Sequence, residues 1–291
     1  MKEKVVIYNR KEQMYEDGSQ YAGEILDILY NTWGGRILLK FLIHPAVSAL
    51  YGLYNDSRIS KKRIEPFVRK NNIRMEDYVQ QEYRCFNDFF IRKVKEEKRP
   101  VSPETDKLVA PADCKISAYT ITKDKRIRIK GVEYTLEELV NHRLDLKGYE
   151  GGECLVFRLS VDDYHRYIFL DHGKVTARFP VKGKLHTVCS ISKEYKIYRE
   201  NTRVINRLET ENFGQVIMIE VGALLVGRIV NYPIKKFAKG MEKGYFKVGG
   251  STIVMLFQKD AVVLDQDIRE KIKEGVEVKV FMGEVIGSKK G

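Results

Sequence analysis

The residues best suited to chemistry in this sequence are two glycines followed by a serine and a threonine, Gly249-Gly250-Ser251-Thr252. Glycines allow backbone torsions that other residues disfavour, and they leave the Gly250 carbonyl without side-chain cover. The Ser251 hydroxyl follows that carbonyl directly and could attack it. The apolar run from Ile253 to Phe257 predicts a buried strand that would hold the serine in place. Taken alone, such a motif usually marks only a turn.

A serine hydroxyl is a weak nucleophile at neutral pH and needs a base, normally a histidine oriented by a carboxylate. Asp113 supplies a carboxylate in Pro111-Ala112-Asp113, just after a short apolar run. His165 follows a predicted strand, and His186 begins another extended piece. These are the residue types of a catalytic triad with Ser251, but their spacing does not establish that they meet.

The composition favours a folded protein with an anionic partner. Of the 291 residues, 43% are hydrophobic and 32% charged, which excludes general disorder. The net charge of +12 points to a membrane surface, a nucleic acid or an acidic ligand. The sequence shows no nucleotide-type glycine fingerprint and no metal-ligand cluster, and we expect neither a secretory signal at Met1-Lys2-Glu3-Lys4 nor a membrane-spanning helix. The cysteines suit a reducing cytoplasm, because they are scattered without paired spacing: Cys85, Cys114, Cys154 and Cys189.

The first hundred residues predict mainly helices. Residues 1–35 indicate an irregular lead-in, and Arg36–Tyr54 carries a helical apolar stripe that is kinked near Pro45. A basic segment from Arg58 to Arg74 follows. This order is typical of a helix lying on an anionic bilayer, although a helix packed on its own domain with a solvated basic face explains it equally well. Met75–Val94 predicts a second helix with an aromatic, core-facing side.

The second part of the chain predicts a β-rich domain. Arg99-Pro100-Val101-Ser102-Pro103 indicates a connector, so we expect a helical membrane-docking region at 1–100 and a catalytic domain at 101–291. The fold class expected is α+β, with a mostly antiparallel sheet. The predicted strands are Lys125–Lys130, Cys154–Ser160, Val216–Val221, Leu224–Val230, Ile253–Phe257 and Val276–Met282, and the predicted helices are Leu136–His142 and Gln266–Glu274.

Several motifs together give the chain a resemblance to the phosphatidylserine decarboxylase proenzymes of prokaryotic type, over most of its length. Each motif is weak alone, but their common order at plausible separations is highly specific. They are Phe86-Asn87-Asp88-Phe89-Phe90-Ile91-Arg92 with Arg99-Pro100, Pro111-Ala112-Asp113, Asp163-Tyr164-His165-Arg166, Val221-Gly222-Ala223 with Val226-Gly227, Gly249–Thr252 and Met282-Gly283-Glu284.

The resemblance implies self-cleavage between Gly250 and Ser251, into a β chain of residues 1–250 and an α chain of residues 251–291. In that family the serine attacks the preceding carbonyl, the amide becomes an ester, and β-elimination converts Ser251 into a pyruvoyl cofactor. The pyruvoyl carbonyl forms a Schiff base with the amine of phosphatidylserine and accepts the electrons released as CO2 leaves, which yields phosphatidylethanolamine. No metal or nucleotide is required.

The implied partners are phosphatidylserine, an anionic membrane surface, and the chain's own two fragments as a heterodimer, whose further dimerisation stays open. The implied location is peripheral, on the cytoplasmic side of the cell membrane. No nucleic acid is expected, because the basic residues lie beside an apolar stripe and form no aromatic-plus-basic binding motif.

One position departs from the family pattern. Ile168 in Tyr164-His165-Arg166-Tyr167-Ile168 occupies the place of a second histidine that commonly acts as the cleavage base. The resemblance assigns the family's catalytic roles directly to Asp113 and Ser251, and it implies that His165 is an active-site residue. The base is then His165 itself or His186, towards which the sequence leans slightly, with His172 a weaker choice.

Two other enzyme-related readings stay open at this point. One is a pyruvoyl-dependent decarboxylase of a soluble amino acid, which the basic amphipathic segment disfavours. The other is an uncleaved, inactive membrane-bound homologue, which the isoleucine at position 168 favours.

Overall fold

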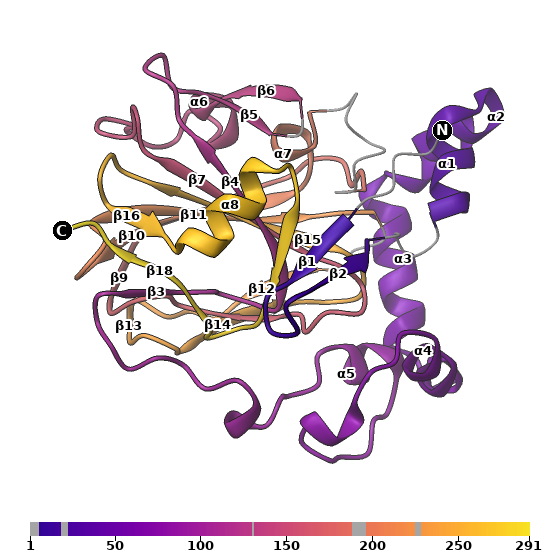
Figure 1. Ribbon diagram of the computed structural model, residues 1–291. Helices are drawn as coiled ribbons and strands as arrows, with labels where there is room; N and C mark the ends of the chain where they lie inside the picture. Colours follow the sequence, from indigo (N-terminus) through magenta and orange to yellow (C-terminus); the bar gives the residue numbers. More distant parts are fainter. Residues whose placement is uncertain (1–5, 19–22, 130, 188–195, 225–227) are drawn as a thin grey trace.

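The computed structural model describes residues 6–18, 23–129, 131–187, 196–224 and 228–291. Val226-Gly227, Cys189 and Met1–Lys4 fall outside these ranges. The described chain is α+β, as expected, with a large and mostly antiparallel sheet at its centre (Figure 1).

The elements follow one another along the chain as short strands and short helices. The helices are α1 (Gly23–Asn31), α2 (Trp33–Leu42), α3 (Pro45–Asp56), α4 (Ile64–Lys70), α5 (Phe86–Phe90), α6 (Leu136–Leu139), α7 (Ile197–Glu200) and α8 (Gln266–Lys273), with 3-10 turns η1 (Arg58–Arg63), η2 (Met75–Asp77) and η3 (Glu96–Lys98). The strands are β1 (Val6–Asn9), β2 (Met14–Asp17), β3 (Lys107–Val109), β4 (Cys114–Thr120), β5 (Arg126–Ile129), β6 (Val132–Thr135), β7 (Glu153–Leu159), β8 (Arg166–Ile168), β9 (Gly173–Val181), β10 (Arg203–Thr210), β11 (Gln215–Gly222), β12 (Ile229–Asn231), β13 (Lys236–Phe237), β14 (Glu242–Phe246), β15 (Ser251–Phe257), β16 (Val262–Leu264), β17 (Glu277–Val280) and β18 (Val285–Lys289).

The central sheet has ten strands in the order β13-β9-β10-β11-β15-β7-β4-β17-β1-β2. Its neighbours run antiparallel except for β1 and β17, which are parallel. Strand β15 lies near the middle, between β11 and β7, and all seven of its residues are buried. The apolar run after Ser251 therefore forms the buried strand that its sequence predicts.

Both faces of the sheet are covered, and successive residues of β15 point to opposite faces. Ile253, Met255 and Phe257 pack into the core that the sheet shares with the smaller sheets β12-β14-β8 and β16-β18-β3. Val254 and Leu256 pack on the other side, against residues of the hairpin β5-β6 and of helices α6 and α7. We call these two cores the inner core and the outer core, respectively.

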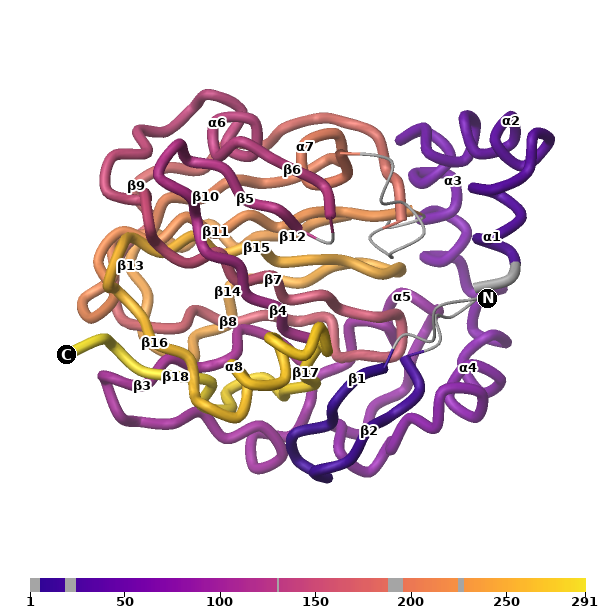
Figure 2. The backbone as a smooth tube through the Cα atoms, turned by 45° about the horizontal axis from the view of Figure 1, so that its top comes forward, coloured from indigo at the N-terminus to yellow at the C-terminus, as the bar shows by residue number. Residues whose placement is uncertain are grey.

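Helices α1 to α5 gather at one end of the sheet, on the side away from the C-terminus (Figures 1 and 2). The predicted kink at Pro45 is confirmed, since α2 and α3 meet at a bend of 70° there. No single helix in the described ranges is long and apolar enough to cross a membrane, whereas this bent pair passes the same test of length and composition.

Two expectations for the amino-terminal region are wrong. The predicted irregular lead-in includes the hairpin β1-β2, which extends the central sheet by pairing with β17, and helix α1. The helix predicted at Met75–Val94 is reduced to η2 and α5, because this stretch folds back on itself: the Val79 amide donates to the Lys93 carbonyl at 2.8 Å. Its aromatic side chains Phe86, Phe89 and Phe90 are nevertheless buried, as predicted.

The predicted elements of the second part are largely confirmed, with boundaries shifted by a few residues. Helices α6 and α8 and strands β5, β7, β11, β15 and β17 occupy the predicted places. The strand predicted from Leu224 begins only at Ile229 within the described residues.

Candidate active site

Ser251 is the first residue of β15 and is held from both sides. It lies opposite Gly222 of β11 and opposite Leu159 of β7. Gly249, two residues earlier, has a φ of 125°, a torsion that side-chain-bearing residues rarely adopt, so the turn before the serine needs glycine there. The Ser251 side chain is fully buried, and its Oγ has no hydrogen-bond partner among the described residues. A buried hydroxyl without a partner is costly and indicates a functional position.

The register of the sheet determines which way Ser251 points. Residues directly opposite one another in an antiparallel pair share a face, and so do residues two apart in one strand. Leu159 and Ile253 belong to the inner core, so Ser251 faces that core, where β8 and β14 lie. Thr252 faces the other way.

His165 immediately precedes β8, in the layer that Ser251 faces. Its carbonyl accepts a hydrogen bond from the Phe246 amide of β14 at 3.0 Å. Its ring packs 4.4 Å, centroid to centroid, from that of Phe90 of α5. The residue is fully buried, and burial lowers the pKa of His165 to about 4, so the imidazole is neutral at pH 7.

A hydrogen bond fixes the tautomer of this imidazole. His165 Nδ1 lies 2.9 Å from the carbonyl oxygen of Asp163. Since a carbonyl only accepts, Nδ1 carries the proton and Nε2 keeps its lone pair. Nε2 has no hydrogen-bond partner among the described residues. Ser251 Oγ thus has a proton to donate and His165 Nε2 can accept one, and both are buried in the same layer without being hydrogen-bonded to each other.

Ile168, in the place of the missing second histidine, is buried near the other end of β8. Its amide donates to the Pro111 carbonyl at 2.9 Å. Tyr167 packs into the inner core, and strand alternation places Ile168 on the opposite face of β8.

Asp113 does not bind a histidine in this structure. Its two carboxylate oxygens accept hydrogen bonds from Arg99 Nε at 2.8 Å and Arg99 Nη2 at 2.6 Å, and one of them also accepts from the Met282 amide at 2.8 Å. Both side chains of this ion pair are buried. Asp113 thus ties the connector at residue 99 to the carboxy-terminal segment, a partnership that sequence reasoning missed although Arg99-Pro100 is one of the shared motifs.

His186 lies at the same end of the sheet as Ser251, but its contacts differ from those of His165. The Asn201 side chain donates to both the His186 carbonyl and the carbonyl of Gly222, each at 2.8 Å, and Gly222 is the residue opposite Ser251. His186 Nδ1 lies 3.4 Å from the Tyr30 hydroxyl of α1. Burial lowers the pKa of His186 to about 4. His172, the third histidine considered, lies in the turn before β9, where its carbonyl accepts from the Glu211 amide at 3.0 Å.

Three cations stand side by side on neighbouring strands, on the face of the sheet that Thr252 shares, because Arg158 lies opposite Thr252. Lys279 of β17 lies opposite Lys115 of β4, which lies opposite Arg158 of β7. Like charges in such positions repel one another, and each has an acidic partner: Glu16 for Lys279, Asp163 for Lys115 and Glu277 for Arg158.

The Lys115–Asp163 pair is buried and ionised at neutral pH. Asp163 accepts from Lys115 Nζ at 2.6 and 2.8 Å and from the Ser160 amide at 2.6 Å. Burial raises the pKa of Asp163 to about 6. Burial alone would lower the pKa of Lys115, but the combined attraction of Asp163 and Asp162 raises it. This pair fixes the loop that carries Asp163 and His165.

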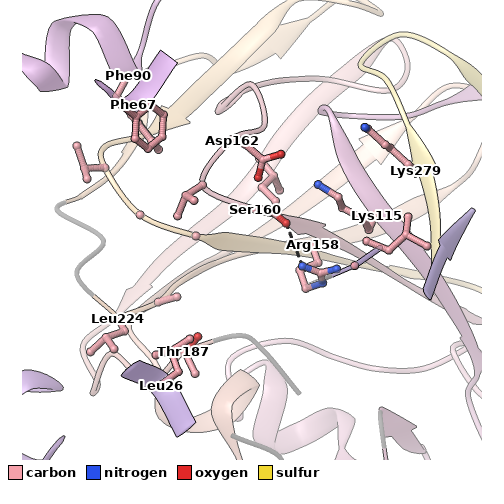
Figure 3. A pocket seen from close by; sticks show the side chains of 18 of the residues that line it. Leu26, Phe67, Phe90, Lys115, Arg158, Ser160, Asp162, Thr187, Leu224 and Lys279 are labelled. Carbon is pink, nitrogen blue, oxygen red and sulfur yellow. Dashed lines mark hydrogen bonds between the residues drawn. The ribbon is translucent and has the colours of Figure 1, made fainter. Parts of the chain in front are cut away.

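A cavity of about 270 Å³ opens between the amino-terminal helices and the end of the sheet (Figure 3). Gly249 and Gly250 line it, so the bond before Ser251 borders an open space. Lys115, Arg158 and Lys279 line one part of the wall, with Asp162 near them, and apolar residues such as Leu26, Phe67, Phe90 and Leu224 line the rest. A polar region beside an apolar wall suits an amphipathic ligand.

The histidine, cysteine and acidic side chains offer two further observations. No group of histidine, cysteine, aspartate or glutamate side chains within them is arranged to hold a metal ion. Cys85, Cys114 and Cys154 are free and buried, and burial raises the pKa of the Cys114 thiol well above its usual value, so it is unreactive.

Comparisons with known proteins place these features in one family. A family model described as phosphatidylserine decarboxylase matches residues 86–288. Phosphatidylserine decarboxylase proenzyme 2 of Clostridium acetobutylicum is 49% identical over 287 residues, covering 97% of this chain and 98% of that protein. The proenzymes of Ruminiclostridium cellulolyticum and of Clostridium botulinum strain Hall are each 39% identical over 292 residues, covering 97–98% of this chain and 97–99% of those proteins.

Proposed function

The chain belongs to the phosphatidylserine decarboxylase family, and we propose that it makes its own pyruvoyl group by cutting the bond between Gly250 and Ser251. It is a decarboxylase that converts phosphatidylserine to phosphatidylethanolamine and CO2, and it is produced as a proenzyme. The observation that carries the proposal is the buried, unpartnered hydroxyl of Ser251 immediately after a glycine turn that borders a cavity.

In the proposed cleavage, Ser251 Oγ attacks the carbonyl carbon of Gly250 and His165 Nε2 takes the hydroxyl proton. The proton passes from His165 to the Ser251 nitrogen as the C–N bond breaks and an ester forms. Loss of the Ser251 α-proton then expels the Gly250 carboxylate and leaves an enamine. Water replaces the nitrogen at position 251 and ammonia leaves, which yields a ketone. The neutral His165, with its proton held on Nδ1 by the Asp163 carbonyl, supports the role of base.

The residues around Ser251 fit the group that would replace it. A pyruvoyl carbonyl condenses with the substrate amine and serves as the electron sink for decarboxylation. The β15 pairings to Gly222 and Leu159 would hold position 251 still, and the buried wall formed by Phe90 would exclude water. Lys115 and Arg158 lie on the cavity wall, each paired with a carboxylate, and make this part of the wall polar.

We further propose that helices α1 to α3 lie on an anionic membrane surface, on the cytoplasmic side. Large apolar side chains on these helices and on η1 face outward in numbers unusual for a protein surface. They are Ile25, Ile28, Trp33, Ile37, Leu38, Phe41, Leu50, Leu53, Tyr54 and Ile59, and Trp33 is 83% exposed. Lys61 and Lys62 are exposed beside them. Exposed apolar residues next to cations support interfacial docking over packing against the protein's own domain.

Two measurements test the proposal together. The mass of freshly expressed protein should show fragments of 250 and 41 residues, the smaller with a blocked amino terminus. The purified protein should release CO2 from phosphatidylserine, and borohydride with substrate should link the two covalently through the smaller fragment. An uncut chain that still releases CO2 would contradict the origin of the cofactor in Ser251.

A further inference from the structure

Arg63 is set apart from the other cations of the cavity. It lines the cavity together with Lys115, Arg158 and Lys279. Each of those three pairs with a carboxylate, whereas no acidic side chain of the described residues lies within ion-pair distance of Arg63. Its guanidinium donates to two neutral oxygens instead, those of the Tyr51 hydroxyl at 2.9 Å and of the Asn55 side chain. Arg63 therefore brings a positive charge to the cavity that no described carboxylate neutralises.

The guanidinium is also held in a fixed plane. Its carbon lies 4.5 Å from the centre of the Phe86 ring and 5.5 Å from that of Tyr51. A planar, stacked guanidinium with donors to spare matches the oxygens of a phosphate group, and stacking reduces the entropy lost when it binds one.

Arg63 lies between the membrane-facing helices and the cleavage turn. On one side it bonds Tyr51 and Asn55 of α3, the helix whose Leu50 and Leu53 are exposed. On the other side, Phe86 belongs to the same apolar cluster as Phe90 and Val248, next to the glycine turn. A phospholipid has the same order of parts: acyl chains, then the phosphodiester, then the amine that must reach position 251.

We propose that Arg63 binds the phosphodiester of phosphatidylserine and so sets the depth at which the headgroup enters the cavity. This inference rests on the proposed function. It also divides the basic cluster Lys61-Lys62-Arg63, since the two lysines face solvent and the arginine faces the cavity. In this proposal the lysines contact the membrane surface, and Arg63 binds the lipid in the cavity.

The test uses the self-cleaved enzyme and dihexanoyl phosphatidylserine as monomers below its critical micelle concentration, so that membrane docking plays no part. Arg63→Gln should be cut normally and should lose roughly tenfold to hundredfold in kcat/KM, mainly through KM, because a hydrogen bond to a charged group is lost. The kcat/KM of Arg63→Lys should lie between those of the parent and Arg63→Gln, since lysine keeps the charge but not the paired donors of the guanidinium. Arg126→Gln removes a distant exposed arginine that pairs with Glu133, and it should behave like the parent.

A second probe separates the phosphate from the substrate carboxylate. Glycerophosphoethanolamine carries the phosphodiester without that carboxylate, and its inhibition constant should rise in Arg63→Gln by the same factor as KM. Unchanged inhibition would assign Arg63 to the carboxylate and overturn the proposal. So would a parental KM for monomers, or an Arg63→Gln chain that folds but stays uncut.

If Arg63→Gln does not fold, Arg63→Lys carries the same comparisons, and a parental KM and inhibition constant in that variant would overturn the proposal. Failure of the proposed function is recognised separately, because the parent enzyme itself would then be uncut or inactive.

Discussion

The Nδ1 atom of His165 lies 2.9 Å from the backbone carbonyl oxygen of Asp163, two residues earlier in the chain. A histidine that acts as a base needs a neighbour to fix its tautomer, and here a carbonyl does so while the Asp113 carboxylate binds Arg99. The loop that carries this carbonyl is itself held by the buried Lys115–Asp163 ion pair. The orientation of the imidazole thus depends on a loop conformation, and the proposed cleavage requires no histidine at position 168.

The Ser251 hydroxyl should be essential for cleavage, and the adjacent Thr252 hydroxyl should not. Both are buried without a hydrogen-bond partner among the described residues, but they face opposite sides of the sheet. We expect Ser251→Ala to remain one chain and Thr252→Val to be cut like the parent, as measured by gel electrophoresis and mass spectrometry. A cut alanine variant, or an uncut valine variant that folds, would contradict this assignment.

Replacing each histidine in turn should identify the cleavage base. We expect His165→Asn to stay uncut and inactive, because it removes the acceptor Nε2 while keeping a donor of similar size. His186→Asn should be cut, since the Asn201 contacts to residues 186 and 222 are made to backbone carbonyls and persist without the imidazole. The reverse pattern would assign the base to His186, as the sequence alone slightly favours.

Stability should fall in acid, in part because of His165. Burial lowers its folded-state pKa to about 4, against about 6.5 in the unfolded chain, so the unfolded state binds the proton first as the pH drops. The contribution of the neutral His165 to the free energy of unfolding is intact above pH 6.5. As the pH falls towards 4, about 3 kcal/mol of that free energy is lost.

The raised pKa of Asp163 acts in the opposite direction over part of this range, so the parent alone does not isolate the histidine. The measurement is therefore the difference in unfolding free energy between the parent and His165→Asn, at pH 7 and at pH 4.5. Relative to the parent, the unfolding free energy of His165→Asn should be higher at pH 4.5 than at pH 7. A difference that does not change with pH would show that His165 is not buried in its neutral form.

Asp113 has a structural partnership that complicates any test of its part in cleavage. Asp113→Ala leaves the buried Arg99 without its carboxylate and should destabilise the protein by about 3–5 kcal/mol. Asp113→Leu combined with Arg99→Met removes both charges and should recover most of that loss. If Asp113 takes part in cleavage, as the family resemblance implies, the folded double variant stays uncut. A double variant that is cut at the parental rate would limit Asp113 to holding Arg99 and Met282 in place.

Trp33 offers a direct reading of membrane docking, because it is the single tryptophan of the chain and is highly exposed. Its fluorescence should shift to the blue on vesicles containing anionic lipid, and salt should weaken binding. Replacing Lys61 and Lys62 by glutamine should cost about 1 kcal/mol each on such vesicles. Unchanged fluorescence and binding would favour a surface that meets protein instead of lipid.

The sequence predicts the elements whose signal is local and misses the partnerships that are not. The kink at Pro45, the strand after Ser251 and the helix at Gln266–Lys273 follow from proline, from an apolar run and from helix-ending residues. The pairing of β1 with β17 joins residues about 270 positions apart and has no local signature. The same is true of the site: Ser251 is evident from its glycines, but the Asp113–Arg99 and Lys115–Asp163 pairs follow from the fold alone.

Strand β15 begins at the bond proposed for cleavage, and this position has a consequence for how the mature enzyme unfolds. The 41-residue fragment would keep β15 between β11 and β7 and β17 between β4 and β1, and its β18, which pairs with β16 of the same fragment, would stay beside β3. The smaller fragment is interleaved with the larger one and cannot leave without opening the sheet. Folding would therefore be a one-time event for the uncut chain, and heat inactivation of the cut enzyme would be irreversible at high dilution, where the separated fragments seldom meet.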